Sequence, residues 1–116
     1  MVNDRRRSPR VRVNLPARWE GAMHQGVATV TDLSENGCFV LSGGTVEVKE
    51  LIWLEIELPE GELLRFWTEV VDAAYEIGFA VRFNSGNEDA EARLRTYIET
   101  VFASNSRKLE NPNPLL

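Results

Sequence analysis

The stretch LIWLEIELPEGELLRFWTEVV, residues 51–71, decides the fold. In its first part Leu54, Ile56 and Leu58 alternate with glutamates, which is the period of a strand with one buried face. The sequence PEGE at 59–62 is typical of a turn, and a second apolar stretch follows it. The stretch therefore predicts two strands joined by a turn.

Similar strands are expected on both sides of this pair. Every second residue from Val11 to Trp19 is apolar or small, and Pro16 predicts that this strand lies at an edge or bends there. Further strands are indicated by VATVTDL, by the apolar run after DLSENG, and by IGFAVRF at 77–83, in which Ile77, Phe79, Val81 and Phe83 are expected to face inward. Short strands at roughly ten-residue spacing without intervening helices predict a small antiparallel barrel or sandwich.

After residue 85 the period becomes helical. Ser85 and Glu88 suggest a capping box. The apolar stripe that follows is expected to pack on the barrel, across an open end, and consists of Ala90, Leu94, Tyr97, Ile98, Val101 and Phe102. From Ser104 the composition favours a disordered tail. The expected organisation is a flexible arginine-rich segment (1–10), a barrel with a C-terminal helix (11–103) and a tail (104–116).

Length and composition limit the possible classes of protein. The chain has 116 residues, 43% of them hydrophobic, which suits one domain with one core. Its one cysteine, Cys38, excludes an internal disulfide or a Cys/His metal site. No apolar run reaches the ~18 residues of a membrane span, and no signal peptide is evident, so a cytoplasmic protein without membrane insertion is expected.

Positive charge is concentrated at the N-terminus. The first 18 residues hold six arginines and one acid, whereas the rest of the chain has 7 basic and 17 acidic residues, a net charge of −10. An acidic body repels a long polyanion, while a short basic segment remains free to hold a small anion. The distribution favours a compact anionic ligand over a nucleic acid polymer. It leaves a small-barrel binder of RNA or single-stranded DNA as a weaker alternative.

Residues for catalysis are sparse. His24 is the only histidine and lies in an expected loop, and the paired carboxylates in EIE and EDAE suit solvated positions. No glycine-rich phosphate loop precedes the helix. We therefore expect neither an enzyme nor a metal site or a cofactor.

Two short motifs remain. Arg6 and Arg10 have the spacing R-x-x-x-R, and Asp32, Ser34 and Gly37 form D-x-S-x-x-G between two expected strands. Either motif alone is weak evidence for a binding site. Arginines at this spacing occur by chance in many basic tails, and DLSENG also suits a plain turn in which Asp32 and Ser34 bond nearby amides and Gly37 takes a positive φ.

Together, in this order and separation, the motifs resemble those of the PilZ domain family. The resemblance covers residues 5 to about 103 and includes the late strand IGFAVRF and the helix after it. It implies a mainly β fold, a six-stranded antiparallel β-barrel with one C-terminal α-helix, that binds the second messenger cyclic di-GMP. Arg6, Arg10, Asp32, Ser34 and Gly37 are the implied ligand-binding residues.

The residue types match that ligand. A guanidinium can bond guanine O6 and N7 together and can pair with phosphate, and a carboxylate such as Asp32 can accept from guanine N1 and N2. Gly37 would let the backbone approach the ligand closely. Arg5 and Arg7 are additional candidates, most useful if a stacked pair of ligands is bound. Neither Trp67 nor Val71 can be assigned to a ligand contact, and Trp67 is interpreted as packing.

The expected function is that of a stand-alone receptor, a monomer or weak dimer. Binding of cyclic di-GMP orders the N-terminal segment and so signals to an unidentified protein effector, in motility or biofilm regulation. The alternative is a PilZ-like interaction domain in motility or envelope machinery that does not bind nucleotide.

Overall fold

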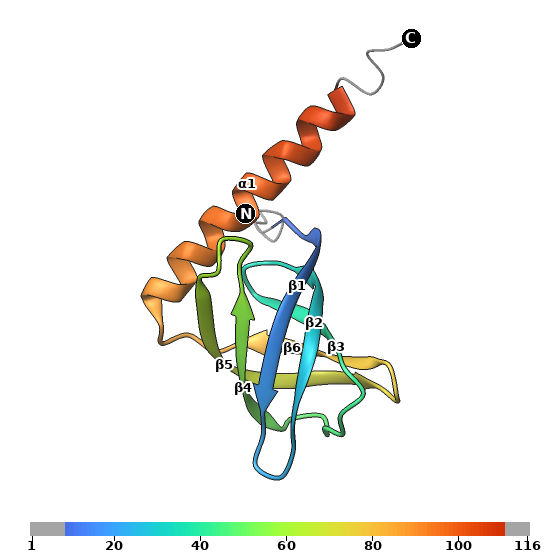
Figure 1. The fold of residues 1–116 in the computed structure, drawn as a ribbon. Helices are drawn as coiled ribbons and strands as arrows, with labels where there is room; N and C mark the ends of the chain where they lie inside the picture. Colours follow the sequence, from blue (N-terminus) through green and yellow to red (C-terminus); the bar gives the residue numbers. More distant parts are fainter. Residues whose placement is uncertain (1–8, 111–116) are drawn as a thin grey trace, which may run out of the picture.

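The computed structural model describes residues 9–110, with side chains to residue 105, and forms a barrel with a helix beside it (Figure 1). Within these residues the elements are β1 (Val11–Glu20), β2 (Gln25–Leu33), β3 (Gly37–Leu41), β4 (Leu51–Glu57), β5 (Leu63–Ala74), β6 (Gly78–Phe83) and α1 (Glu88–Glu110). The strands pair antiparallel and close in the order β1-β2-β3-β6-β5-β4. The predicted six-stranded barrel with a C-terminal helix is confirmed.

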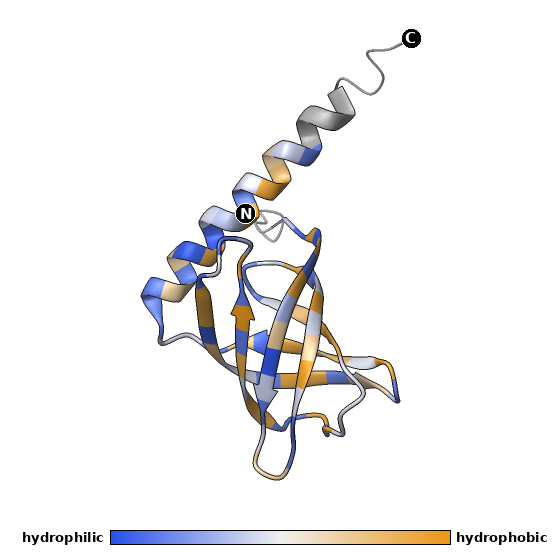
Figure 2. Cartoon of the chain, in the orientation of Figure 1, coloured by the Kyte–Doolittle hydropathy of each residue, from blue (hydrophilic) through white to orange (hydrophobic). Residues whose placement is uncertain are grey.

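The alternating sequence pattern fills the barrel interior. Hydrophobic and hydrophilic residues alternate along the strands (Figure 2), and β4 has the burial pattern that its sequence predicts, with Ile52, Leu54 and Ile56 fully buried. Trp19 packs edge-on against Phe79 at a centroid distance of 5.5 Å. Closure gives each described strand a neighbour on both sides over part of its length, which protects most of the sheet edges.

Pro16 stands where β1 lacks a neighbour on one side. The β1–β4 ladder covers only Ala17 to Glu20, whereas β2 pairs with β1 along most of its length. A proline, which has no N–H to donate, is tolerated at such a position. The edge position predicted for Pro16 is therefore present locally, inside a closed barrel.

One residue of the predicted inward set is misplaced. Ile77 precedes β6 in the β5–β6 turn, and 57% of its side chain is exposed. Its amide donates to the carbonyl of Ala74, which closes the turn. The apolar alternation of IGFAVRF begins one residue before β6, so it could not show where the strand starts.

The predicted N-cap of the helix, Ser85, is wrong by two residues. The N-cap is Asn87, whose side-chain oxygen accepts from the amide of Ala90 at 3.2 Å, while the Glu91 carboxylate accepts from the amide of Gly86. Acidic residues in the first turn of α1 favour the positive end of the helix dipole.

Helix α1 packs by its first turns only. Ala90, Leu94 and Ile98 are buried, α1 contacts β5 and β1, and the helix then runs past the barrel (Figure 1). Phe102, predicted to pack, is 49% exposed. The helix continues to Glu110, although a tail was expected from Ser104; its backbone bonds are internal and need no apolar face. No helix in the described part of the chain is long and apolar enough to cross a membrane.

Candidate ligand-binding site

Arg10 and the D-x-S-x-x-G motif lie at the same end of the β1–β2 pair. Val11 pairs with Leu33 in the antiparallel register, so Arg10, just before Val11, and Ser34, just after Leu33, lie at the same end. Arg10 is exposed. Arg5, Arg6 and Arg7 lie outside the described residues.

Extra residues in β1 and β2 distort the sheet beside this end. Between the pairs Arg12–Asp32 and Leu15–Val30, β1 has two residues and β2 has one, Thr31. Opposite Thr31, β3 has no extra residue, because Val30 pairs with Val40 and Asp32 with Phe39. Such bulges increase local twist and redirect side chains.

The bulge at Thr31 is what turns Asp32 outward. Val30 and Leu33 are both buried, which strict alternation would forbid, since residues three apart face opposite sides of a strand. The extra residue shifts the phase between them, so that the Asp32 side chain is 47% exposed while Leu33 enters the core. The sequence pattern identified Asp32 but not the distortion that exposes it.

Asp32 already has a cationic neighbour. Arg12 Nε lies 3.5 Å from Asp32 Oδ1, and the Arg12 side chain is 87% exposed. An exposed pair of this kind contributes only about 0–1 kcal/mol. Arg12 was not among the predicted site residues, although its place on the outer face of β1, directly opposite Asp32, could have identified it.

An open hollow of about 720 Å³ lies over the distorted strands. It is lined by Arg12, Val13, Asn14, Thr29, Thr31, Asp32 and Leu41. The lining offers a cation, a carboxylate, an amide and two hydroxyls, which suits a polar ligand that carries both donors and acceptors.

Ser34 is engaged within its own turn. Its amide donates to the Gly37 carbonyl at 2.9 Å, and its hydroxyl oxygen accepts from the Asn36 amide at 3.2 Å. The turn interpretation of this segment is thus confirmed for Ser34.

Gly37 has a role that the sequence did not reveal. Its φ is not positive, and a Cβ here would lie far inside van der Waals contact with the carbonyl oxygen of Val81 on β6. The glycine permits close approach of β3 to β6. It is required by the fold, whatever else it contributes to the site.

The motif turn is also connected to the rest of the domain. The backbone carbonyl of Asn36 accepts from the amide of Phe83 at the end of β6. Glu35 Oε1 lies 3.5 Å from Arg95 Nε on α1. A ligand that moved this turn would therefore act on neighbours in β6 and α1.

Other residues considered from the sequence lie elsewhere. Trp67 packs against Trp53, as interpreted, but it does so on the outer face of β5, where it is 37% exposed. His24 is exposed, and Cys38 is buried, which raises the pKa of its thiol well above the usual value. No cluster of three metal-ligating side chains occurs in the described residues.

Comparison with known proteins supplies the family. The family model described as "PilZ domain" matches residues 4–100. The chain belongs to the PilZ domain family. No curated protein matches it.

Solved PilZ structures share the fold. The PilZ domain of CeSA from a cellulose-synthesising bacterium is 19% identical, with a TM-score of 0.62, over 84% of this chain and 98% of that chain. YcgR from Escherichia coli, solved in complex with c-di-GMP, is 15% identical with a TM-score of 0.76, over 94% of this chain and 51% of that one. The Bacillus subtilis inhibitor of motility MotI/DgrA is 17% identical with a TM-score of 0.71, over 91% and 53% respectively. This PilZ chain thus spans about half the length of the last two.

Proposed function

We propose that this PilZ domain binds cyclic di-GMP at the hollow over β1, β2 and β3, and that Arg6, Arg10, Asp32 and Ser34 contact the ligand. The observation that carries the proposal is the convergence of Arg10 and Ser34 at the end of the β1–β2 pair, next to the outward-turned Asp32. Binding of c-di-GMP by the structurally similar YcgR supports it.

The chemistry of the site assigns different tasks to its side chains. Arg6 and Arg10 would engage guanine O6 and N7 or the phosphates, since a guanidinium forms paired bonds with both. The Asp32 carboxylate would accept from guanine N1 and N2. Arg12, which now faces Asp32, would be released to pair with a phosphate. Arg5 and Arg7 are further contacts, above all for a stacked ligand pair.

The same arrangement suggests how the signal passes on. Residues 5–10 would order over the barrel when their arginines bind, at a cost of about 6–12 kcal/mol for these ~6 residues. Several charge-assisted bonds of about 1.5–3 kcal/mol each offset that cost. The ordered segment would then present a new surface to a protein effector in the cytoplasm. Amide exchange in residues 4–12 should slow on binding, and unchanged exchange would contradict this relay.

Isothermal titration of cyclic di-GMP into the purified chain tests the binding proposal. We expect saturable binding of micromolar or tighter affinity, a loss of at least about tenfold in Arg6→Ala and in Arg10→Ala, and no competition by GTP. Arg18→Ala is the matched control, because Arg18 is also on β1 but borders a different hollow. Absence of binding would reject the receptor and favour the alternative, a PilZ interaction domain that does not bind nucleotide.

A further inference from the structure

A second surface, on the opposite side of the barrel, has features of a protein interface. Around the barrel β5 is three strands from β2 in either direction, so the outer face of β4 and β5 points away from the ligand hollow. We call this the tryptophan face. It comprises Leu51, Trp53, Glu55, Glu57, Leu63, Arg65, Trp67 and Glu69.

Large apolar side chains on this face are open to solvent. Trp53 is 39% exposed, Trp67 37%, Leu51 45% and Leu63 56%. The two tryptophan rings lie 4.7 Å apart, and the Arg65 guanidinium is 4.7 Å from the Trp53 ring. Tryptophan and arginine are the residue types that most often dominate the energy of protein interfaces.

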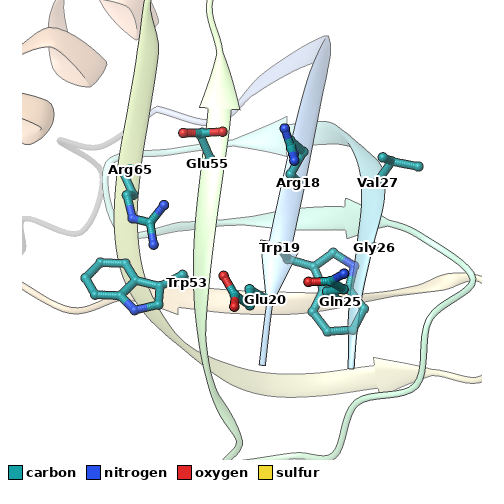
Figure 3. Close-up of a pocket in the computed structure, with 9 residues that line it drawn as sticks. All are labelled: Arg18, Trp19, Glu20, Gln25, Gly26, Val27, Trp53, Glu55 and Arg65. Carbon is teal, nitrogen blue, oxygen red and sulfur yellow. The ribbon is translucent and has the colours of Figure 1, made fainter. Parts of the chain in front are cut away.

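Charges of both signs stand beside the tryptophans. A hollow of about 370 Å³ next to Trp53 is bordered by Arg18, Glu55 and Arg65, and Figure 3 shows Glu55 between the two arginines, each on its own strand. Within residues 9–105, no ion pair joins Glu55 to any of these cations. The face therefore offers both an unpaired carboxylate and unpaired guanidinium groups.

The strand register makes this face complementary to itself. Trp53 is directly opposite Trp67, and Glu55 is directly opposite Arg65, in a β4–β5 ladder without register shifts. Consider a two-fold axis that relates two copies, runs parallel to these strands and lies above the line midway between them. It places each residue of one copy opposite the cross-strand partner of that residue in the other copy. Two copies placed face to face about this axis bring each Trp53 against Trp67 of the partner subunit and each Glu55 against Arg65 of the partner subunit. Toward the ends of the ladder the same axis sets Leu51 against Glu69 of the partner subunit and Leu63 against Glu57 of the partner subunit, so the complementarity is carried by the two central pairs.

We propose that the tryptophan face forms a two-fold symmetric homodimer of this chain. Two-fold interfaces require such self-complementary patches. Stacked sheets also keep their strand directions within about 30° of each other, which an axis along the strands preserves. A partner of one charge sign would meet a like charge at Glu55 or at Arg65, whereas a second copy meets an opposite charge at both.

The dimer is expected to be weak. A stable interface buries about 800 Å² on each partner, more than two tryptophans and two leucines supply. Sedimentation equilibrium of the nucleotide-free chain from low micromolar to millimolar concentration should show the mass rising from monomer toward dimer. Trp67→Ala should shift the midpoint by about tenfold or more. Tyr75→Ala removes an aromatic ring that is 87% exposed outside the face and should leave the midpoint unchanged.

A charge-exchange experiment tests the geometry itself. Glu55→Arg and Arg65→Glu should each abolish self-association, because each sets like charges against one another across the axis. An equimolar mixture of the two variants should form a heterodimer, since both contacts are then opposite in sign. Glu99→Arg, the same charge change on an exposed position of α1, is the control and should behave as wild type.

Two outcomes would overturn the proposal. One is a monomeric wild type at every concentration. The other is a dimer that persists in both single variants. Circular dichroism of each variant establishes that it is folded before its mass is interpreted, and since these positions are on the surface we expect the fold to be retained. The experiment uses no nucleotide, so its result does not depend on the ligand proposal.

Discussion

The two faces of this barrel differ in the regularity of their strand pairing. On the tryptophan face β4 and β5 pair over seven residues without a register shift, and side chains stand in rows. On the ligand side the β1–β2 and β2–β3 ladders both shift next to Asp32. Regular pairing produces rows of side chains suited to another protein surface, whereas extra residues produce a hollow that can receive a small molecule. The same closed sheet would thus provide both of the proposed surfaces.

The largest effect is expected from a substitution in the barrel itself, because it would disturb both faces at once. Gly37→Ala would drive a Cβ into the Val81 carbonyl, so β3 and β6 could not pair as they do. We expect the free energy of unfolding to fall by about 2–4 kcal/mol, which urea denaturation would measure.

Gly43→Ala is the matched control, because a Cβ there has nothing within 4 Å. It should change stability by less than about 0.5 kcal/mol. Equal stability of the two variants would show that the barrel tolerates a wider β3–β6 spacing.

Alternation was sufficient for the strands because it reports burial directly, but it left a barrel and a sandwich open, and the closed six-stranded barrel was predicted from the resemblance to the PilZ family. Six strands, their approximate limits and the inward residues of β4 follow from period two, and the period of α1 is equally clear up to Ile98. Beyond Val101 the helix leaves the barrel, so the apolar pattern no longer marks its length. That is why Phe102 and the helix end at Glu110 were misjudged.

The site was predicted by motif and not by geometry. The motif named Asp32 and Ser34, which lie near the Arg10 end, but the bulge at Thr31 and the pairing of Arg12 with Asp32 depend on cross-strand register. No local pattern specifies register where extra residues interrupt a ladder. The exposure of Trp67 was missed for a related reason: in β5 its aromatic neighbour Phe66 faces inward, and aromatic residues at adjacent positions do not reveal which one is buried.

The independence of the two faces can be tested by a pair of substitutions. Asp32→Ala should weaken cyclic di-GMP binding by about 10–100-fold, the value of one or two bonds to a charged acceptor, as measured by titration calorimetry. It should leave self-association unchanged. Trp67→Ala should do the reverse, and a loss of ligand affinity in that variant would mean that the two faces are coupled.

A smaller effect is expected beneath the tryptophan face. Thr68 is fully buried, and its hydroxyl donates to the Ile52 carbonyl at 3.1 Å. Thr68→Val keeps the shape and removes this bond, so unfolding should become easier by about 1 kcal/mol. Ligand affinity should not change. A variant as stable as wild type would indicate that the β4–β5 ladder holds its register without this bond.

The smallest effect is the pH dependence of stability that comes from Cys38, which is buried on β3. Burial raises the pKa of the Cys38 thiol above its usual value of 9.0, so near pH 9 the unfolded chain loses this proton while the folded chain keeps it. Stability should therefore fall as the pH rises, by about 0.8 kcal/mol between pH 8 and pH 9.5 for this group. Urea unfolding of Cys38→Ala at the same pH values should lack that part of the decline. Parallel curves would mean that solvent reaches the thiol.

The close approach of β3 to β6 has a consequence for how motifs are read in sequences. Gly37 is the last residue of D-x-S-x-x-G, yet the Val81 carbonyl alone requires it, and Gly78 meets the Val40 carbonyl in the same way. A barrel that had lost its ligand would still retain these glycines. The positions that indicate nucleotide recognition in such chains are therefore the carboxylate and the arginines. A motif search that gives the glycine equal weight would also detect barrels that need the glycine only for folding.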